Sequence, residues 1–358
     1  MVRGIKTKAL FFSVLLPLSI LPACTKKKAD SANVSFEKLG IAKVKYLTGF
    51  ALNGDPICRG TDENVLRWSN SKKEWSVLGT LPNLPSGYFM EAKCEDAQGN
   101  FYSSVSDSGC YVLIGGTGTW KKLDLNYVNA TLTSTSEWKA DILSNNKGDV
   151  AMQTEKRSGG SVKTLRKTAA SNTWELILDD SVWVGNLLKI TDNGDVFRAG
   201  TDIGLHVIKA GTNTSVKVTD CTPSVALNNA YCGYKAAVNQ TGGIMFYGGL
   251  GEMPMFWLNA GATYPAKPVQ VFDRPENTCC FNAGFEYLAD GTCLGQANKG
   301  GYDDYYLYIR KNGASSWTKA ETISDISTKI IYFRANAKGE VYAGPASLGE
   351  YPLYKLSY

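Results

Sequence analysis

Residues 188–197 read Leu-Lys-Ile-Thr-Asp-Asn-Gly-Asp-Val-Phe, in which an Asn-Gly pair separates two β-rich runs. Such a pair is typical of a β-hairpin turn, because both central residues need a positive φ. Related turns recur at Asn53-Gly54-Asp55, Gln98-Gly99-Asn100, Lys147-Gly148-Asp149, Thr241-Gly242-Gly243, Asp290-Gly291-Thr292 and Lys338-Gly339-Glu340. With Gly194 included, the gaps between successive glycines are 45, 49, 46, 48, 49 and 48 residues. The spacing predicts seven structural repeats.

A second signal keeps the same period. An aromatic residue follows the glycine by 21 to 26 residues at Trp75, Trp120, Trp174 and Trp317, and Ser215 and Tyr264 fill the same slot in two other repeats. One apolar run, such as 65–68, precedes the aromatic residue, and another, such as 75–78, begins at it. Each repeat is therefore predicted to hold four strands, A to D, with the glycine between A and B. Units of this kind are typical of β-propeller blades.

The two ends of the chain fit a closed ring. The seventh repeat reaches strand C at 352–358 and lacks strand D, whereas Ser35–Leu39 reads like the D strand at 120–123. We expect the N-terminal strand to complete the last blade and to protect its exposed edge. The predicted fold is all-β, a seven-bladed β-propeller over residues 34–358. The alternatives are an open β-solenoid and a ring of six or eight blades.

The N-terminus has the parts of a secretory signal. Basic residues at 3, 6 and 8 precede a mainly apolar stretch at 9–21, and Leu21-Pro22-Ala23-Cys24 follows. The stretch is too short and wrongly flanked for a good membrane span. Its ending resembles the lipobox of bacterial lipoproteins, which implies cleavage before Cys24 and a diacylglyceryl group on its sulfur. The alternative is an ordinary signal peptide with a chance cysteine. We expect a signal peptide at 1–23 and a lipidated tether at 24–33.

The residue after the expected lipid site bears on location. Inner-membrane lipoproteins tend to carry Asp there, and this chain carries Thr25, so the resemblance implies the outer membrane. We expect a protein of the cell envelope, held to a membrane by Cys24. Ten residues separate Cys24 from Ser35 and span at most about 35 Å, which would keep the propeller near the membrane.

The predicted propeller is close to electrically neutral. The formal net charge of the chain is +5, and removal of residues 1–23, with three basic residues and no acid, leaves +2. The tether holds three lysines and one aspartate at 24–33, which leaves zero for the rest. A neutral body argues against nucleic-acid binding, which needs a basic surface.

Eight of the nine cysteines remain when Cys24 is set aside. An even number in an exported protein suggests disulfides. We name one pair, Cys221 with Cys232, because the two flank a loop rich in Pro, Ser and Asn. The cysteine spacings are unlike those of zinc sites and the chain has one histidine, so we expect no metal and no other cofactor.

The turns before the aromatic residues resemble those of known propellers. Residues 116–120 and 313–317 resemble the Asp-box (BNR) repeat of sialidase-like propellers, although the Asp of that repeat is missing here. Residues 59–62 and 196–205 resemble the repeats of two-component-regulator propellers. Both resemblances imply the fold, and neither identifies a substrate.

The sequence contains no constellation that we recognise as catalytic. A Ser-His-Asp triad would need His206, the only histidine, which occupies an apolar position of strand C and is predicted to be a core residue. The arginines that a sialidase would need do not occupy equivalent positions in the repeats. A carbohydrate-active enzyme, either a sialidase-like glycoside hydrolase or a polysaccharide lyase, stays the alternative, and it would show two carboxylates about 5–10 Å apart in a central pocket.

The B–C and D–A loops of a propeller share one face, which we call the loop face. These loops are long and irregular here, which is typical of binding residues. Each B–C loop carries an acidic residue, and aromatic rings beside carboxylates are typical of sugar sites. The candidate binding residues are Arg59, Trp183, Arg198, Asp202, Tyr302, Asp303, Asp304 and Tyr305. We expect a non-catalytic protein that binds a protein or glycan partner there.

Overall fold

The structure is a computed structural model. It describes residues 34–40, 44–105, 109–123, 125–127, 130–132, 138–156, 162–180, 186–200, 204–219, 236–246, 255–267, 269–272, 281–298, 305–320, 331–345 and 352–358. All of them belong to one compact unit, Ser31–Tyr358. Apart from a 3₁₀ turn at Ile114–Gly116, their regular structure consists of strands, so the all-β prediction is confirmed.

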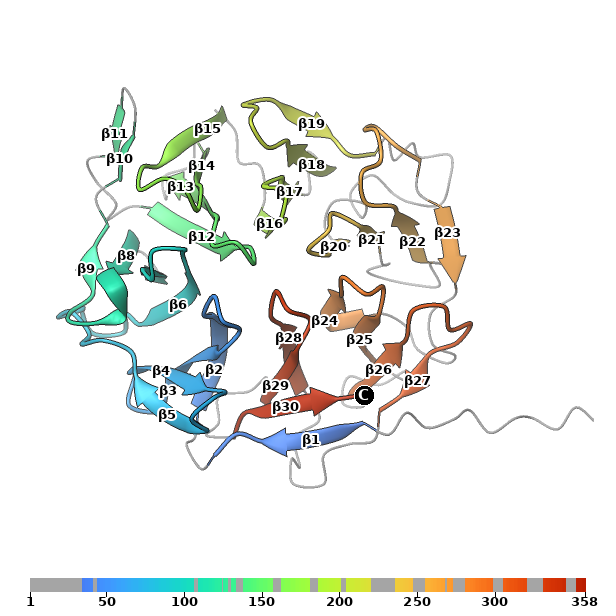
Figure 1. Ribbon diagram of the computed structural model, residues 1–358, viewed down its shortest axis with the longest axis horizontal. Coiled ribbons are helices and arrows are strands. Elements are labelled where there is room, and N and C mark those ends of the chain that lie inside the picture. The colour runs from blue at the N-terminus through green and yellow to red at the C-terminus, as the bar shows by residue number, and fades with distance from the viewer. Residues whose placement is uncertain are drawn as a thin grey trace, which may run out of the picture. The chain divides into compact units, whose positions relative to one another are not determined.

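Seven four-stranded blades surround a central axis (Figure 1). Blades 1 to 3, with strands given from the inside outward, are β2 (Val44–Phe50), β3 (Pro56–Gly60), β4 (Val65–Ser69) and β5 (Glu74–Val77); β6 (Met90–Glu95), β7 (Phe101–Val105), β8 (Gly109–Leu113) and β9 (Lys121–Lys122); and β12 (Trp138–Ser144), β13 (Val150–Lys156), β14 (Val162–Lys167) and β15 (Glu175–Asp180). A hairpin of β10 (Leu125–Tyr127) and β11 (Ala130–Leu132) lies between blades 2 and 3 in the sequence.

Blades 4 to 7 complete the ring. They are β16 (Asn186–Ile190), β17 (Val196–Gly200), β18 (Gly204–Ile208) and β19 (Ser215–Lys217); β20 (Ala236–Val238), β21 (Ile244–Phe246), β22 (Met255–Leu258) and β23 (Val269–Phe272); β24 (Phe281–Tyr287), β25 (Cys293–Asn298), β26 (Tyr305–Arg310) and β27 (Thr318–Lys319); and β28 (Ile331–Ala335), β29 (Val341–Pro345), β30 (Tyr354–Ser357) and β1 (Ser35–Lys38). The seven-bladed prediction is confirmed.

The last blade is made from both ends of the described chain. Strand β1 pairs antiparallel with β30, with Ser35 opposite Ser357 and Lys38 opposite Tyr354 (Figure 1). The half-buried Phe36 packs against the core between blades 6 and 7. The prediction that the N-terminal strand closes the ring is therefore confirmed.

Each interface between neighbouring blades has its own apolar cluster. Between blades 1 and 2, for example, Ile57 and Leu78 of one blade pack with Met90, Phe101 and Trp120 of the next. Six further clusters occupy the other six interfaces within the described residues. The core is thus divided into seven layers that lie between blades.

The repeated aromatic residues pack in these apolar layers, as predicted from their spacing. Trp120 and Trp174 are buried, and Trp75 is half-buried. The indole N–H of Trp120 donates to the Leu78 carbonyl of the preceding blade at 2.9 Å, and that of Trp75 donates to the Leu39 carbonyl at 2.8 Å. His206 differs from its prediction. It is half-buried beside the core residues Leu205 and Val207, and its Nδ1 lies 3.1 Å from the Ser215 hydroxyl.

The seven glycines occupy one position of the A–B turns. Their φ values lie between 77° and 90°, which only glycine adopts at no steric cost. In blade 4, Gly194 donates its N–H to the Thr191 carbonyl at 2.9 Å, and Thr191 donates to the Asp195 carbonyl at 3.0 Å. The hairpins expected from the sequence are present, with five residues between strands A and B in this blade.

In three blades, an asparagine three residues before the turn glycine forms a hydrogen bond to the following blade. In blades 3, 5 and 7 the side-chain oxygen accepts backbone N–H groups of its own turn, and the side-chain nitrogen donates to a backbone carbonyl of the following blade. Asn145 donates to Thr191 at 2.8 Å, and Asn239 donates to Leu288 at 3.3 Å. Asn336 donates to Gly54 at 3.0 Å across the seam between blades 7 and 1.

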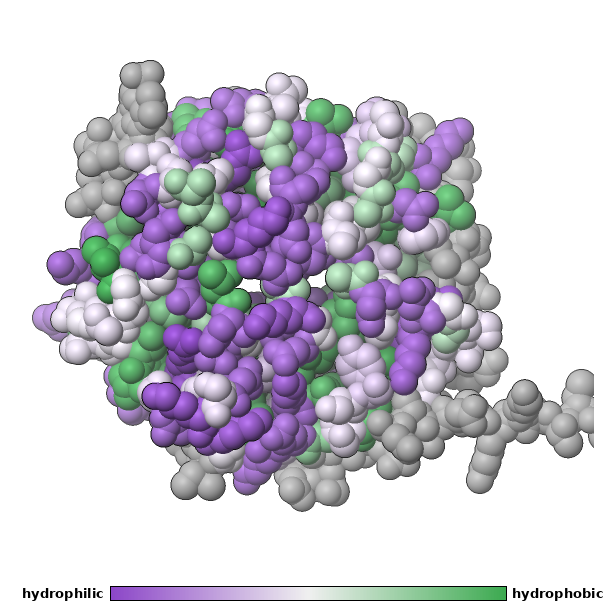
Figure 2. All heavy atoms as spheres, viewed as in Figure 1, coloured by the Kyte–Doolittle hydropathy of each residue, from purple (hydrophilic) through white to green (hydrophobic). Residues whose placement is uncertain are grey.

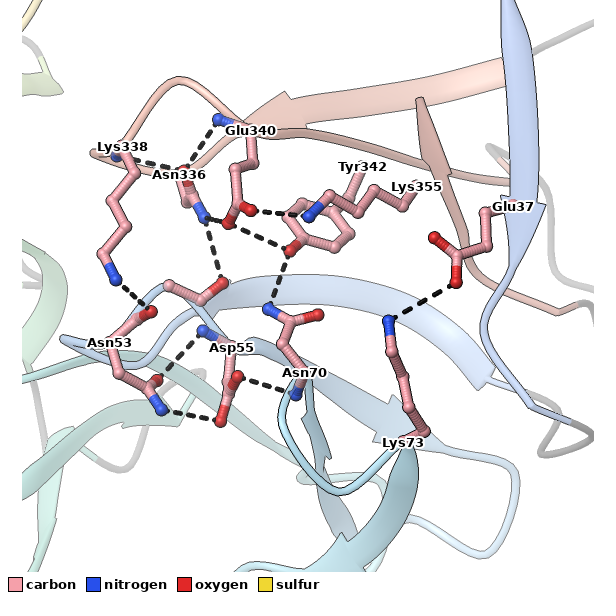
Figure 3. A network of polar contacts seen from close by, with 11 residues as sticks. Glu37, Asn53, Asp55, Asn70, Lys73, Asn336, Lys338, Glu340, Tyr342 and Lys355 are labelled. Carbon is pink, nitrogen blue, oxygen red and sulfur yellow. Dashed lines mark hydrogen bonds and ion pairs between the residues drawn. The ribbon is translucent and has the colours of Figure 1, made fainter. Parts of the chain in front are cut away.

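The seam carries further polar contacts (Figure 3). Lys338 donates to the Asn53 carbonyl at 2.6 Å, and Asn70 donates to the Tyr342 hydroxyl at 3.0 Å. On the outer side, Lys73 of blade 1 pairs with Glu37 of β1 at 3.4 Å. The junction of the two chain ends is therefore held by hydrogen bonds as well as by the pairing of β1 with β30.

The described cysteines correct the expectation that the even cysteine count reflects disulfides. Cys58, Cys94, Cys110 and Cys293 are free thiols buried in the core, so the even count does not reflect four disulfides. Burial raises the pKa of the Cys110 thiol to about 12. The proposed partners Cys221 and Cys232 lie outside the described residues, and their disulfide stays a prediction.

Loss of the apolar contact of β1 should weaken the closure. Phe36→Ala removes a half-buried ring from the blade 6–7 core, so we expect the free energy of unfolding to fall by about 1–3 kcal/mol. Urea denaturation followed by tryptophan fluorescence measures this loss. Lys38→Ala, an exposed change on the same strand, is the control. Equal stability of the Phe36→Ala variant and the wild type would contradict a closing role for β1.

Candidate functional site

A cavity of about 330 Å³ lies on the axis of the ring. Every blade contributes to its wall through strand A, and residues of several A–B turns, such as Gly54 and Asn146, line one end. Figure 2 shows an opening at the centre of the ring that is bordered mainly by hydrophilic residues. The cavity is therefore a product of the whole ring.

The wall is charged, although it is made of inner strands. One residue from each blade illustrates this, in ring order from blade 1: Thr48, Lys93, Asp141, Lys189, Ala237, Glu286 and Arg334. Five of the seven are ionisable. We call these five the axial charges: Lys93, Asp141, Lys189, Glu286 and Arg334.

The axial charges influence one another electrostatically. Burial raises the pKa of Asp141, and the positive charges of Lys93 and Arg334 oppose that rise only in part. Burial also raises the pKa of Glu286 against the opposing effects of Lys189 and Arg334. Burial lowers the pKa of Lys189, although Glu286 and Asp192 favour its charged form. Each of these groups borders the cavity while protein surrounds most of its surface.

Close ion pairs are rare among the axial charges. Lys93 pairs with Glu91 at 2.6 Å, and Arg334 donates to the Thr48 carbonyl at 3.3 Å. Within the part of the chain that the structure describes, the Lys189 ammonium makes no hydrogen bond and no ion pair. Asp141 and Glu286 have backbone N–H partners but no ion pair among those residues. Among the described residues, the cations of the cavity wall thus form no ion pair with Asp141 or Glu286.

The A–B turns narrow one end of the cavity. Asn146 of blade 3 donates to the Ala337 carbonyl of blade 7 at 3.0 Å, although these blades are not neighbours. The same amide nitrogen also donates to Asp192 of blade 4 at 3.0 Å. These contacts bring turns from opposite parts of the ring together beside Lys338, another residue of the cavity wall.

Arg59 is the centre of a second cluster, which lies on the loop face. Its guanidinium carbon is 3.7 Å from the centre of the Phe89 ring and 5.9 Å from that of Tyr46. Glu63 forms ion pairs with both Arg59 and Lys45. We call these five residues the Arg59 cluster: Lys45, Tyr46, Arg59, Glu63 and Phe89.

Glu63 holds the Arg59 cluster in a fixed arrangement. It lies in the B–C loop of blade 1 with a φ of 68°, a conformation that few residues other than glycine adopt. Burial pushes the pKa of Glu63 upward, but hydrogen bonds from Lys45 and Arg59 outweigh burial and hold the pKa below its ordinary value. The Glu63 side chain is still 42% exposed, so the cluster is both ordered and accessible.

Most of the other predicted binding residues are not described by the structure. Trp183, Asp202, Tyr302, Asp303 and Asp304 lie outside the described residues and stay predictions. Tyr305 begins β26, and its side chain also lies outside the described part.

Arg198 does not belong to an exposed surface. Its side chain is 1% exposed and pairs with Asp180 of blade 3 at 2.8 Å. Burial lowers the pKa of Arg198, and the Asp180 carboxylate opposes that effect. The residue joins blades 3 and 4, and we remove it from the candidate contact residues.

The axial charges were not predicted from the sequence. A signal existed, because Lys189, Glu286 and Arg334 each stand five residues before the glycine of their turn. Asp141 and Lys93 stand seven and six residues before theirs. The register of β6 shifts between Ala92 and Cys94, which places Lys93 in an irregular position. A strict period therefore finds three of the five.

The sequence matches no protein-family profile and no curated protein. Solved structures match it over most of its length. The oligogalacturonate lyase of Vibrio parahaemolyticus is 11% identical with a TM-score of 0.56, over 90% of this chain and 96% of that one. YCF48 of Cyanidioschyzon merolae is 11% identical with a TM-score of 0.56, over 90% and 98%. The WD40 propeller domain of Doa1 is 11% identical with a TM-score of 0.52, over 90% and 96%.

This chain has a β-propeller fold. At these identities the likeness extends to the fold alone, and the similar structures include both an enzyme and propellers that are not described as enzymes. Among the described residues, no helix has the length and apolar character needed to cross a bilayer. The same residues contain no group of three or more His, Cys, Asp and Glu side chains placed to hold a metal ion.

Replacement of Glu286 should make the stability of the ring less dependent on pH. Because its pKa is raised above the ordinary 4.5, its contribution is present below that pH and is lost as the pH rises through the folded-state pKa. Glu286→Gln resembles the protonated form at every pH. We expect the variant to unfold at a higher temperature than the wild type at pH 7.5, with a difference that shrinks toward pH 4.5.

Calorimetric unfolding across this pH range measures the effect. Glu37→Gln is the control, since Glu37 makes an exposed ion pair on β1. A Glu286→Gln variant that is less stable than the wild type at pH 7.5 would show that attraction to Lys189 and Arg334 outweighs the cost of burial.

Proposed function

We propose that this chain is a lipid-anchored protein of the cell envelope that binds a protein or glycan partner on its loop face and catalyses no reaction. The observation that carries the proposal is the Arg59 cluster. It places two aromatic rings, an arginine and an acidic side chain at one site of the face where propeller loops gather. Aromatic and arginine side chains are enriched at the centres of protein interfaces.

The fixed geometry of the cluster favours binding. Arg59 is held between Phe89 and Glu63, so little side-chain freedom is left to lose when a partner binds. Lys45 and Glu63 are 30% and 42% exposed and can form charged contacts at the rim. YCF48, a propeller similar in fold, has been solved bound to a D1 peptide, which supports a protein as the partner class.

The anchor rests on the sequence. Leu21-Pro22-Ala23-Cys24 supplies the modification site, and Thr25 in place of Asp supports the outer membrane. With a tether of ten residues, the propeller would search for partners close to the membrane surface.

A second candidate function is a carbohydrate-active enzyme. Asp141 and Glu286 favour it, since both carboxylates line one central cavity and burial raises the pKa of each. A raised pKa suits a carboxyl group that acts as a general acid. Both carboxylates have cations nearby but no ion pair with a described residue, an arrangement that also suits binding alone.

Truncation of the Arg59 cluster should weaken capture of the native partner. We expect Phe89→Ala and Arg59→Ala to reduce it about fivefold or more, as loss of a central contact residue does. Crosslinking in native envelopes, followed by quantitative recovery of the full chain and a parallel glycan array, measures capture. Lys72→Ala, an exposed change in the β4–β5 turn, is the control.

Unchanged capture by both cluster variants would contradict the proposed binding surface. Turnover of a polysaccharide by the wild type, abolished in Asp141→Asn, would replace the binding proposal with the enzyme. The two results are independent, because the Arg59 cluster and Asp141 lie in different sites.

The anchor has its own test. Cys24→Ser should abolish labelling with a radioactive fatty acid and move the protein out of the membrane fraction, because the modified sulfur is lost. Thr25→Ala leaves the cysteine intact and should keep the label. Labelling that survives in Cys24→Ser would mean that lipid is attached elsewhere or not through this signal.

A further inference from the structure

We propose that the axial cavity binds a small hydroxycarboxylate, a ligand of sugar-acid size that carries one carboxylate and several hydroxyls. The site is formed by the axial charges inside the ring. It is separate from the Arg59 cluster and does not depend on the partner proposed for the loop face.

The size of the cavity suits such a ligand. Small-molecule sites commonly measure about 300–1,000 Å³, and the cavity measures about 330 Å³. A monosaccharide acid is of a size that such a cavity can hold.

The ammonium of Lys189 indicates a ligand rather than a purely structural role. Ion pairs that join strands elsewhere in this protein are in contact, as with Arg198 and Asp180 at 2.8 Å or Arg67 and Asp55 at 3.0 Å. By contrast, Lys189 makes no hydrogen bond or ion pair within the described chain, although its ammonium borders the cavity. A buried charge without a partner is costly, so an incoming group that contacts it gains more than it would at the surface.

The charge of the wall matches a single carboxylate. Four cationic side chains line the cavity, namely Lys93, Lys189, Arg334 and Lys338, against the two carboxylates of Asp141 and Glu286. Glu91 neutralises Lys93 through its ion pair. The wall itself therefore presents more cations than carboxylates, which favours a ligand that carries a carboxylate over a neutral sugar.

The carboxylates of Asp141 and Glu286 explain why we expect hydroxyl groups on the ligand. Asp141 lies in blade 3 and Glu286 in blade 6, and the positive charge of Arg334 acts on both. An ionised carboxylate accepts hydrogen bonds only, so each prefers a donor on the ligand. Arg334 and Lys189 would hold the ligand carboxylate, while Asp141 and Glu286 would accept from its hydroxyls.

Calorimetric titration of the full chain in detergent micelles tests this site. The probe is sodium glucuronate, and glucose, sodium acetate and alanine are titrated at the same ionic strength. We expect one glucuronate to bind per chain, about tenfold or more tightly than glucose, acetate or alanine. Lys189→Met should weaken glucuronate binding about tenfold or more, whereas the surface change Lys72→Met should leave it unchanged.

Lys189→Met removes an unpaired, half-buried charge, so its unfolding temperature should equal or exceed that of the wild type. If this variant does not fold, Arg334→Met supplies the same comparison, because Arg334 is the other cation proposed to hold the ligand carboxylate. Absence of saturable glucuronate binding would overturn the proposal, as would equal binding by wild type and cavity variants. Acetate that binds as tightly would reduce the site to a general anion site, and preference for alanine would assign it to zwitterions. Both results contradict the proposed class.

Discussion

The pairing of β1 with β30 is the constraint on which the rest of the molecule depends. It joins segments at opposite ends of the described chain and converts seven sheets in series into a ring. Only a closed ring brings the inner strands of blades 2, 3, 4, 6 and 7 around one axis, so the juxtaposition of the axial charges follows from this pairing. The cavity is as dependent on the outermost strand of blade 7 as on the residues that line it.

Two kinds of interaction hold the blades in order. Apolar layers fill all seven interfaces and provide most of the burial. The asparagines at 145, 239 and 336 add a directional contact at three of them. Apolar layers tolerate small slips, whereas a hydrogen bond from a turn to a given carbonyl fixes the height of one blade against the next.

Blades 1 and 2 show how closely the inner strands of two neighbouring blades can approach. Phe50 of β2 pairs with Cys94 of β6 in a parallel bridge that joins the two blades into one eight-stranded sheet. A side chain at Gly49 would place its Cβ 1.9 Å from the Lys93 carbonyl oxygen. Gly49 is therefore needed for proximity, unlike the turn glycines, which are needed for their positive φ.

The fold was largely predictable because the same sequence pattern repeats in each blade. Seven glycine turns, a series of aromatic residues and the spare strand at 35–39 each report local chemistry that repeats. The cavity was harder to foresee. Alternation along a strand assigns Leu187 and Lys189 to one face, but an inner strand packs against neighbours on both sides, and the bulge between them breaks the alternation. The cysteine count misled for another reason, since it does not distinguish an oxidised pair from thiols packed in strands such as β3 and β25.

The split blade also has a consequence for biosynthesis. β1 is made before β30, and residues 39–353 must be synthesised before the two strands can meet. During that interval β1 is an unpaired strand, which is a hazard for intermolecular sheet formation. Its sequence, Ser-Phe-Glu-Lys, carries one apolar residue and two opposite charges. The strand that closes the ring thus has a low tendency to aggregate. It can remain unpaired in the nascent chain without forming a sheet with another molecule.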